Sequence, residues 1–191
     1  MNRNEIGSPS WKSVMVTRHL PEKLSGLETL CKNLWWCWND NAKDLFKSID
    51  YNLWHKSGHN PMVILDRVSY KRYLALSQDE EFVARLDAVM QEFNSYMAKK
   101  SERTEPSVGY FCMEYGLDTS LKIYSGGLGI LAGDYLKESS DMNVNLVAVG
   151  LLYRYGYFTQ RLTPQGNQVA ECQAQDFLKI PAEPVFDENG V

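Results

Sequence analysis

The 191-residue chain lacks the marks of several protein classes. It contains no apolar run long enough to span a bilayer, and residues 1–7 lack the apolar core of a signal peptide. No basic patch stands out, and the formal net charge of −4 argues against a general nucleic-acid binder. We therefore expect a cytoplasmic protein with no membrane partner and no nucleic-acid partner.

Cysteine and histidine are also scarce. The four cysteines, Cys31, Cys37, Cys112 and Cys172, contain no CxxC pair. Without a secretion signal this pattern indicates reduced thiols. The three histidines all lie between residues 19 and 59, away from the last two cysteines. No zinc or other metal site is expected.

In the first hundred residues, apolar residues recur mainly at the spacing of an α-helix. One stripe is predicted to form a helix that begins near Pro21: Leu24, Leu27, Cys31, Leu34, Trp35 and Trp38. Its tryptophans favour core packing over stacking on sugar rings. Asn60-Pro61 indicates a second helix start. Ser77 and Glu80 have the form of a capping box, ahead of a further stripe: Phe82, Leu86, Val89, Met90, Phe93 and Met97.

The pattern changes after a charged, aperiodic linker at 99–106. Residues 108–113 and 144–152 are predicted to form strands, the first of them buried on both faces. A helix between them would bury Leu128, Leu131, Ala132, Tyr135, Leu136 and Met142, with Asp134, Lys137 and Asp141 on its solvent side. This βαβ unit implies a parallel sheet. We expect an α/β fold with two parts, a helical extension over 1–105 and an incomplete parallel sheet over 106–191.

One βαβ unit does not make a domain, because a parallel sheet needs further strands and helices on both faces. Asn189-Gly190 is a hairpin signal that stands at the end of the sequence. We therefore expect the chain to be the N-terminal portion of a longer protein.

Three glycines, Gly126, Gly127 and Gly129, precede the predicted helix of the βαβ unit. Glycine permits positive φ and close approach to the main chain, and a helix start offers unpaired N–H groups to an anion or a sugar hydroxyl. A tight turn without a ligand explains the glycines equally well. A Walker A loop is excluded because no Gly-Lys-Ser/Thr follows. Gly127, Gly129 and Gly133 also have the wrong spacing for a dinucleotide fingerprint.

Two further segments lie at the same predicted edge of the sheet. Glu114 directly follows the first strand, at the carboxyl end where open α/β sheets bind ligands. Residues 153–161 follow the second strand and are rich in tyrosine and arginine. They fit a sugar site, although the aromatics could also be core and Arg154 a surface charge.

Three motifs in order resemble the opening of an α-glucan (glycogen, starch or maltodextrin) phosphorylase. They are residues 110–117 (YFCMEYGL), 124–134 (YSGGLGILAGD) and 150–160 (GLLYRYGYFTQ). Residues 33–39 (NLWWCWN) resemble the helical N-terminal extension of a bacterial and archaeal branch. The resemblance covers roughly residues 20 to 191.

The resemblance implies a glycosyltransferase with two Rossmann-like domains of the GT-B type. Its reaction would be reversible phosphorolysis of α-1,4-glucans by inorganic phosphate to glucose 1-phosphate. It implies that the N–H groups of Gly127 and Leu128 meet phosphate and the glucosyl unit, that Gly126 and Gly129 shape the turn, and that Glu114 is the catalytic-site glutamate.

The resemblance also implies pyridoxal 5′-phosphate, whose attachment lysine has no matching motif in this chain. The fragment alone is therefore predicted to be inactive. A homo-oligomer is possible for the whole enzyme. Ser125 and Arg154 depart from the animal and plant pattern, which leaves the preferred glucan length open.

Two alternatives are a glycogen or starch synthase-like GT-B transferase and a non-catalytic glucan-binding module. Tyr124 counts against the synthase, in which a lysine is expected two residues before the glycine pair.

Overall fold

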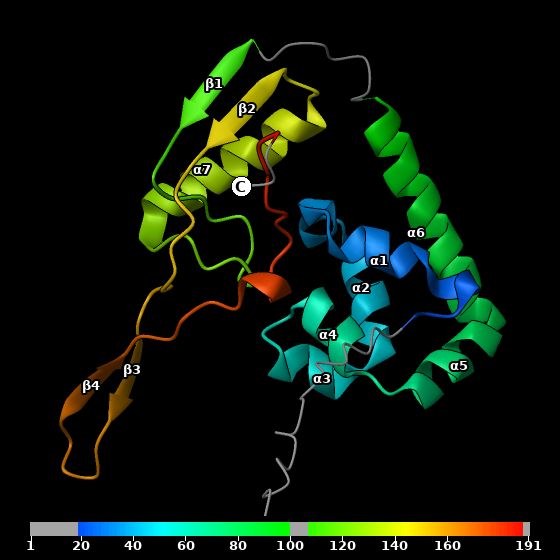
Figure 1. The fold of residues 1–191 in the computed structure, drawn as a ribbon, viewed down its shortest axis with the longest axis horizontal. Coiled ribbons are helices and arrows are strands. Elements are labelled where there is room, and N and C mark those ends of the chain that lie inside the picture. Colours follow the sequence, from blue (N-terminus) through cyan, green and yellow to red (C-terminus); the bar gives the residue numbers. More distant parts are fainter. Residues whose placement is uncertain (1–18, 100–106, 189–191) are drawn as a thin grey trace, which may run out of the picture.

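The computed structural model describes residues 19–99 and 107–188. Two parts are visible in Figure 1, a helical region on the right and a strand-containing region on the left. The helical region comprises η1 (Glu22–Leu24), α1 (Gly26–Cys31), η2 (Leu34–Trp38), α2 (Asp40–Ile49), α3 (Tyr51–Lys56), α4 (Pro61–Arg67), α5 (Tyr70–Gln78) and α6 (Glu80–Ala98). The other region comprises β1 (Val108–Phe111), α7 (Gly126–Asp141), β2 (Leu146–Val149), β3 (Thr159–Leu162), β4 (Gln168–Glu171) and η3 (Phe177–Lys179).

Side-chain caps separate the short helices. The predicted start at Asn60-Pro61 is confirmed, because Asn60 accepts from the Val63 N–H and Pro61 opens α4. The predicted capping box is wrong. Asp79 caps α6, and Ser77 lies in α5, where its hydroxyl donates to the Leu74 carbonyl.

The single helix predicted from Leu24 onward is also wrong, because the segment breaks into η1, α1 and η2. Asn33 has an extended backbone, and its side chain accepts from the Trp35 N–H, which starts a new 3-10 turn. Local hydrogen bonding of this kind competes with a continuous helix.

The predicted helical core is confirmed. Leu24, Leu27, Cys31 and Trp35 are buried. The tryptophan-rich motif packs in or against the core, as expected in preference to stacking on sugar rings. Trp36, absent from the predicted stripe, is 1% exposed and packs edge-on against Phe46 and Trp54. From α6 the core takes Phe82, Leu86, Val89 and Phe93, and Met90 packs against it, whereas Met97, the last residue of the predicted stripe, is exposed.

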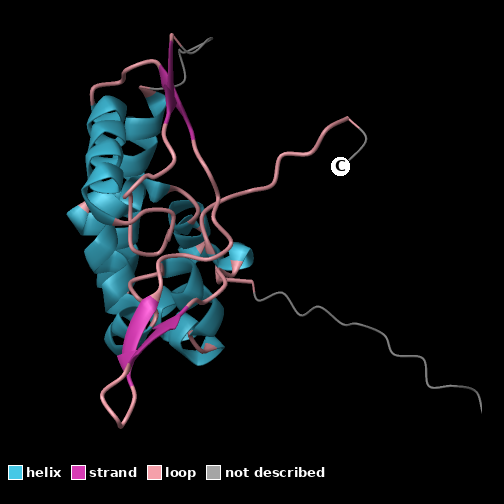
Figure 2. Cartoon of the chain, turned by 90° about the vertical axis from the view of Figure 1, so that its left-hand side faces the viewer, coloured by secondary structure: helices cyan, strands magenta, loops and turns pink. Residues whose placement is uncertain are grey.

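The predicted βαβ unit is confirmed. Strands β1 and β2 pair in parallel, with Val108 opposite Leu146 and Phe111 opposite Val149, and α7 makes the crossover. The hairpin β3–β4 was not predicted; its loop bends at Gly166, whose φ is +82°. Figure 2 shows the two strand pairs at opposite ends of the molecule. The predicted hairpin at Asn189-Gly190 lies outside the described residues.

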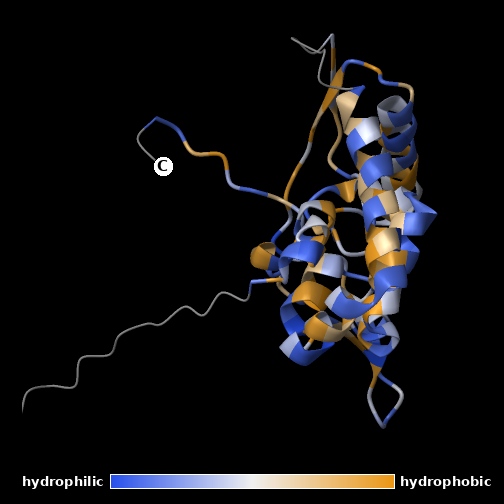
Figure 3. Cartoon of the chain, turned by 90° about the vertical axis from the view of Figure 1, so that its right-hand side faces the viewer, coloured by the Kyte–Doolittle hydropathy of each residue, from blue (hydrophilic) through white to orange (hydrophobic). Residues whose placement is uncertain are grey.

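The predicted burial of the strand–helix unit is wrong for most of its side chains, although Ala132 is buried and Leu136 half-buried. Phe111 is 76% exposed and Leu131 69%, and Leu128, Tyr135 and Met142 are exposed as well. Within residues 19–99 and 107–188 the parallel sheet has two strands, and α7 contacts it through the Tyr135 ring against Tyr110, so no further layer of described residues covers these side chains. Hydrophobic colour accordingly runs along the strands at the top of Figure 3.

The architecture is thus helix-rich, with one small parallel and one small antiparallel sheet, and is compatible with an α/β class. Most of the predicted linker, residues 100–106, lies outside the described residues. The division at 105/106 stays a prediction.

Candidate functional site

The site is built on the connection between β1 and α7, which carries Glu114 at its start and the glycines at its end. Ser125 is the N-cap residue of α7, with an extended backbone (φ −145°). Its side chain makes no capping hydrogen bond to the helix. A serine here normally accepts from an N–H of the first turn. The first-turn N–H groups of α7 are therefore left without that side-chain cap.

Ser125 contacts Glu114 instead. The Ser125 N–H donates to Glu114 Oε2 at 3.2 Å, and the Ser125 hydroxyl lies 3.4 Å from Oε1. Two residues eleven positions apart are thereby joined, and the carboxylate lies beside the start of α7. The structure thus brings Glu114, just after β1, to the residue that precedes the glycines.

The glycines differ in what a side chain would meet. Gly126 has φ +73°, a left-handed conformation that favours glycine. A Cβ on Gly126 or Gly127 would meet no atom within 4 Å, so both face open space. A Cβ on Gly129 would lie 2.5 Å from the Tyr124 Cβ. Two glycines thus leave room for a ligand, whereas the third permits tight packing.

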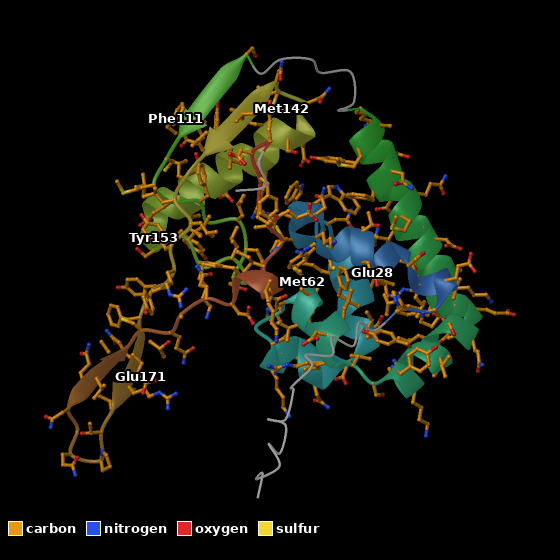
Figure 4. The ribbon with its side chains drawn as sticks, viewed as in Figure 1. Glu28, Met62, Phe111, Met142, Tyr153 and Glu171 are labelled. Atoms are coloured by element: carbon orange, nitrogen blue, oxygen red, sulfur yellow. The ribbon has the colours of Figure 1, made fainter. Side chains whose placement is uncertain are left out.

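Tyrosines from the segment after β2 form the opposite wall. Figure 4 shows Tyr153 just beyond the carboxyl end of β2. An open cleft of about 240 Å³ is lined by Glu114, Lys122, Ile123, Tyr124, Ser125, Tyr153, Tyr155, Gly156 and Tyr157. A neighbouring hollow shares Lys122, Tyr124, Ser125 and Tyr157 and extends to Gly126. The aromatics are therefore not core here, which favours the sugar-site alternative for this segment.

Lys122 and Gln175 belong to the site but were missed from the sequence. In the sequence, Lys122 stands between Glu114 and the glycines. It lines the cleft and brings a positive charge to it. A lysine close before a glycine loop is a readable signal for an anion site. Gln175 has no such signal, because its partners come from distant segments.

Gln175 fastens the tyrosine wall to the loop before α7. Its side-chain amide donates to the carbonyls of Lys122 at 3.0 Å and Tyr153 at 2.6 Å, and its Oε1 accepts from the Lys122 N–H at 3.1 Å. The Gln175 N–H donates to the Arg154 carbonyl at 2.8 Å. One residue thus sets the distance between the two walls.

The helical region supports the same loop. Thr119 donates to the Gly58 carbonyl at 3.3 Å, and the Cys37 thiol donates to the Leu117 carbonyl at 3.5 Å. At the strand ends, the Tyr115 hydroxyl lies 2.8 Å from the Tyr110 carbonyl and 3.1 Å from that of Val149. Burial raises the pKa of the Tyr115 phenol, which keeps it a protonated donor.

Binding of a metal ion and insertion into a membrane have no support in the described part of the chain. Within 19–99 and 107–188, no group of three or more His, Cys, Asp or Glu side chains is placed to hold a metal ion. No helix in these ranges is long and apolar enough to cross a membrane. The chemistry available at the cleft is that of backbone N–H groups, one carboxylate, one lysine and several phenols.

Comparison with known proteins places the chain in a family. The model of the family described as "Protein of unknown function (DUF3417)" matches residues 20–121, just over half of the sequence. The chain belongs to the DUF3417 family. The matched range of this DUF3417 protein covers the helical region, β1 and the loop that carries Glu114, and it ends before the glycines.

Curated relatives extend the comparison across the cleft. The chain is 40% identical to a glycogen phosphorylase of Mycobacterium tuberculosis over 92% of its own length and 22% of the relative's. It is 40% identical to the maltodextrin phosphorylase of Thermococcus litoralis (90% and 21%) and 39% identical to a glycogen phosphorylase of Aquifex aeolicus (86% and 24%). The resemblance predicted from the three motifs is confirmed, and it favours a phosphorylase over a synthase or a binding module.

This DUF3417 chain spans only about a fifth of the length of these relatives. No solved structure matches it.

Proposed function

We propose that this chain is the N-terminal part of an α-glucan phosphorylase, a GT-B glycosyltransferase that releases glucose 1-phosphate from α-1,4-glucans. The observation that carries the proposal is the start of α7. Gly126 and Gly127 face open space, and their helix end lacks a side-chain cap. Gly126 lines a hollow together with Lys122 and Tyr157, and the adjoining cleft is lined by Glu114.

Each group has a physical task in this proposal. The N–H groups of Gly127 and Leu128 bind phosphate and the glucosyl unit, while Gly126 and Gly129 shape the turn. Fixed donors aimed at developing negative charge stabilise a transition state without reorganisation. Lys122 adds positive charge, and the tyrosine faces offer stacking surfaces to sugar rings.

Glu114 is the proposed catalytic glutamate. Its two contacts with Ser125 hold the carboxylate beside the start of α7, which is the proposed binding site of phosphate and the glucosyl unit. The negative charge of Glu114 next to an anion site is balanced by Lys122 and by the helix dipole.

Pyridoxal 5′-phosphate is the proposed cofactor, whose own phosphate supplies acid–base chemistry when bound. The donors found here fit the substrate side of such a site. Lys122 lines the cleft, is exposed and lacks the family's attachment motif. We place the attachment lysine in a second Rossmann-like domain outside this chain. The proposed setting is cytoplasmic, and the whole enzyme is a possible homo-oligomer.

The substitution Gly127→Ala in the full-length protein tests the proposal. A Cβ here meets nothing within 4 Å, so we expect an unchanged or higher melting temperature. The added methyl group projects where the ligand approaches. We expect kcat/KM for phosphate to fall about tenfold or more.

Glucose 1-phosphate release at varied phosphate and saturating glucan measures this effect. Thr163→Ala, in the β3–β4 loop away from the cleft, is the control and should keep full activity. A Gly127→Ala protein that matched the control would overturn the assignment of the glycine loop. A full-length protein without phosphorolysis would overturn the function itself.

A further inference from the structure

A small polar cluster joins the helical region to the end of α7 opposite the glycine loop. Trp38, from η2, donates its indole N–H to Asp141 Oδ1 at 3.1 Å. Tyr96, from α6, donates its hydroxyl to the same oxygen at 2.8 Å, and its oxygen lies 2.7 Å from Ser140 Oγ. Figure 4 labels Met142, the next residue after Asp141, at the end of α7 that faces α6.

The position of Asp141 is electrostatically unfavourable without these donors. It is the last residue of α7, at the negative end of the helix dipole, and the last turn holds no basic residue. Glu138 adds a second carboxylate to the same turn. Hydrogen bonds to an ionised acceptor are stronger than neutral ones. Two donors from the helical region therefore account for an acid at this place.

A second contact fixes α7 near its glycine-rich end. The Gly116 N–H donates to the Gly129 carbonyl at 2.6 Å, and a Cβ on Gly133 would lie 2.2 Å from the Gly116 carbonyl oxygen. Backbone touches backbone here, so the helix has no freedom to approach further. One contact at Gly116 and another at Asp141 together set the direction of the helix axis.

We propose that Asp141 is a positioning residue. With Trp38 and Tyr96 it forms a clamp through which the helical region aims the first-turn N–H groups of α7 at the bound anion. This inference rests on the proposed function of the glycine loop. The proposed role of the helical region is therefore to hold α7, the anion-binding helix, at the end opposite the glycines.

The geometry of the helix sets the size of the effect. At 1.5 Å per residue, about 15 Å of α7 extends from Leu131, between the two glycine contacts, to Asp141, and about 6 Å from Leu131 to Gly127. If the clamp opens and the far end shifts by about 2 Å, the N–H donors shift by nearly 1 Å. A misplacement of that size costs up to about a hundredfold in rate.

Two variants in the full-length enzyme test the clamp. Tyr96→Phe removes one donor, and Asp141→Asn removes the charge. We expect each to raise the KM for phosphate about threefold to tenfold and to lower kcat, while the KM for glucan changes less than twofold. Because both act through one contact, the double variant should be no worse than the more impaired single variant.

Glu138→Gln is the matched control, because it removes a carboxylate from the same helix turn without touching the clamp. It should behave as the unmodified enzyme. If both clamp variants match Glu138→Gln in phosphate KM and kcat, the proposal is overturned.

Hydrogen exchange supplies a readout that does not depend on activity. Peptides covering 120–135 should exchange faster in Tyr96→Phe and Asp141→Asn than in Glu138→Gln, at equal melting temperature. Unchanged exchange in this segment contradicts the clamp. Absence of phosphorolysis in the unmodified enzyme contradicts only the proposed function.

Discussion

Two buried thiols behave as core atoms rather than as reactive groups. Burial raises the pKa of Cys31 and that of Cys37 to about 12, from an ordinary value of 9.0. Cys172 is exposed. With a thiol reagent at pH 8, Cys172 should react rapidly, and the two buried thiols only as the protein unfolds. Mass spectrometry of the labelled peptides measures this order, and early labelling of Cys31 would contradict the assigned packing.

The same raised pKa values make stability depend on pH in the alkaline range. Well below pH 9 both thiols are protonated in the folded and the unfolded chain. Between pH 9 and about 12 the unfolded chain loses protons that the folded chain retains, so stability falls as pH rises. Urea unfolding should show a smaller alkaline loss for Cys31→Ala than for Cys172→Ala, and equal losses would contradict this account.

Among the elements, α7 offers a direct comparison between two glycines. Gly133→Ala forces a Cβ to within 2.2 Å of a backbone oxygen that cannot rotate away, whereas Gly127→Ala meets open space. We expect Gly133→Ala to destabilise the protein by about 1–3 kcal/mol and Gly127→Ala to have no such cost. Thermal unfolding of the pair measures the difference. Equal stability would show that α7 can move away from Gly116.

Sequence periodicity predicted most residues of the helical core. The apolar residues keep their spacing along the chain, and so face the same core, even where the helix is interrupted. Periodicity could not predict the break itself, since the Asn33 side chain competes locally for a backbone N–H. The β3–β4 hairpin was missed because its strands are short and largely polar. In the site, Glu114 and the glycines had local signals, whereas Gln175 is defined only by partners about 22 and 53 residues away.

Across the whole molecule, apolar side chains are distributed unevenly. The helical region buries a continuous core, whereas the outer faces of β1, β2 and α7 expose Phe111, Leu131 and their neighbours. Two paired strands also leave two edges open. Exposed apolar patches and strand edges of this kind are interaction surfaces. In the isolated chain, no described element covers these surfaces, so the same surfaces of two chains can pack against each other.

We therefore expect the isolated chain to self-associate as its concentration rises. Leu131 is 69% exposed on α7, and Leu74 is 42% exposed on α5 of the helical region. Leu131→Glu places a charge within the apolar surface and should weaken association, whereas Leu74→Glu, the same change on another helix, should not. Sedimentation velocity over a concentration series distinguishes them. If both variants associate as the unmodified chain does, the contact lies elsewhere, and the uncovered α7–sheet unit is not the adhesive surface.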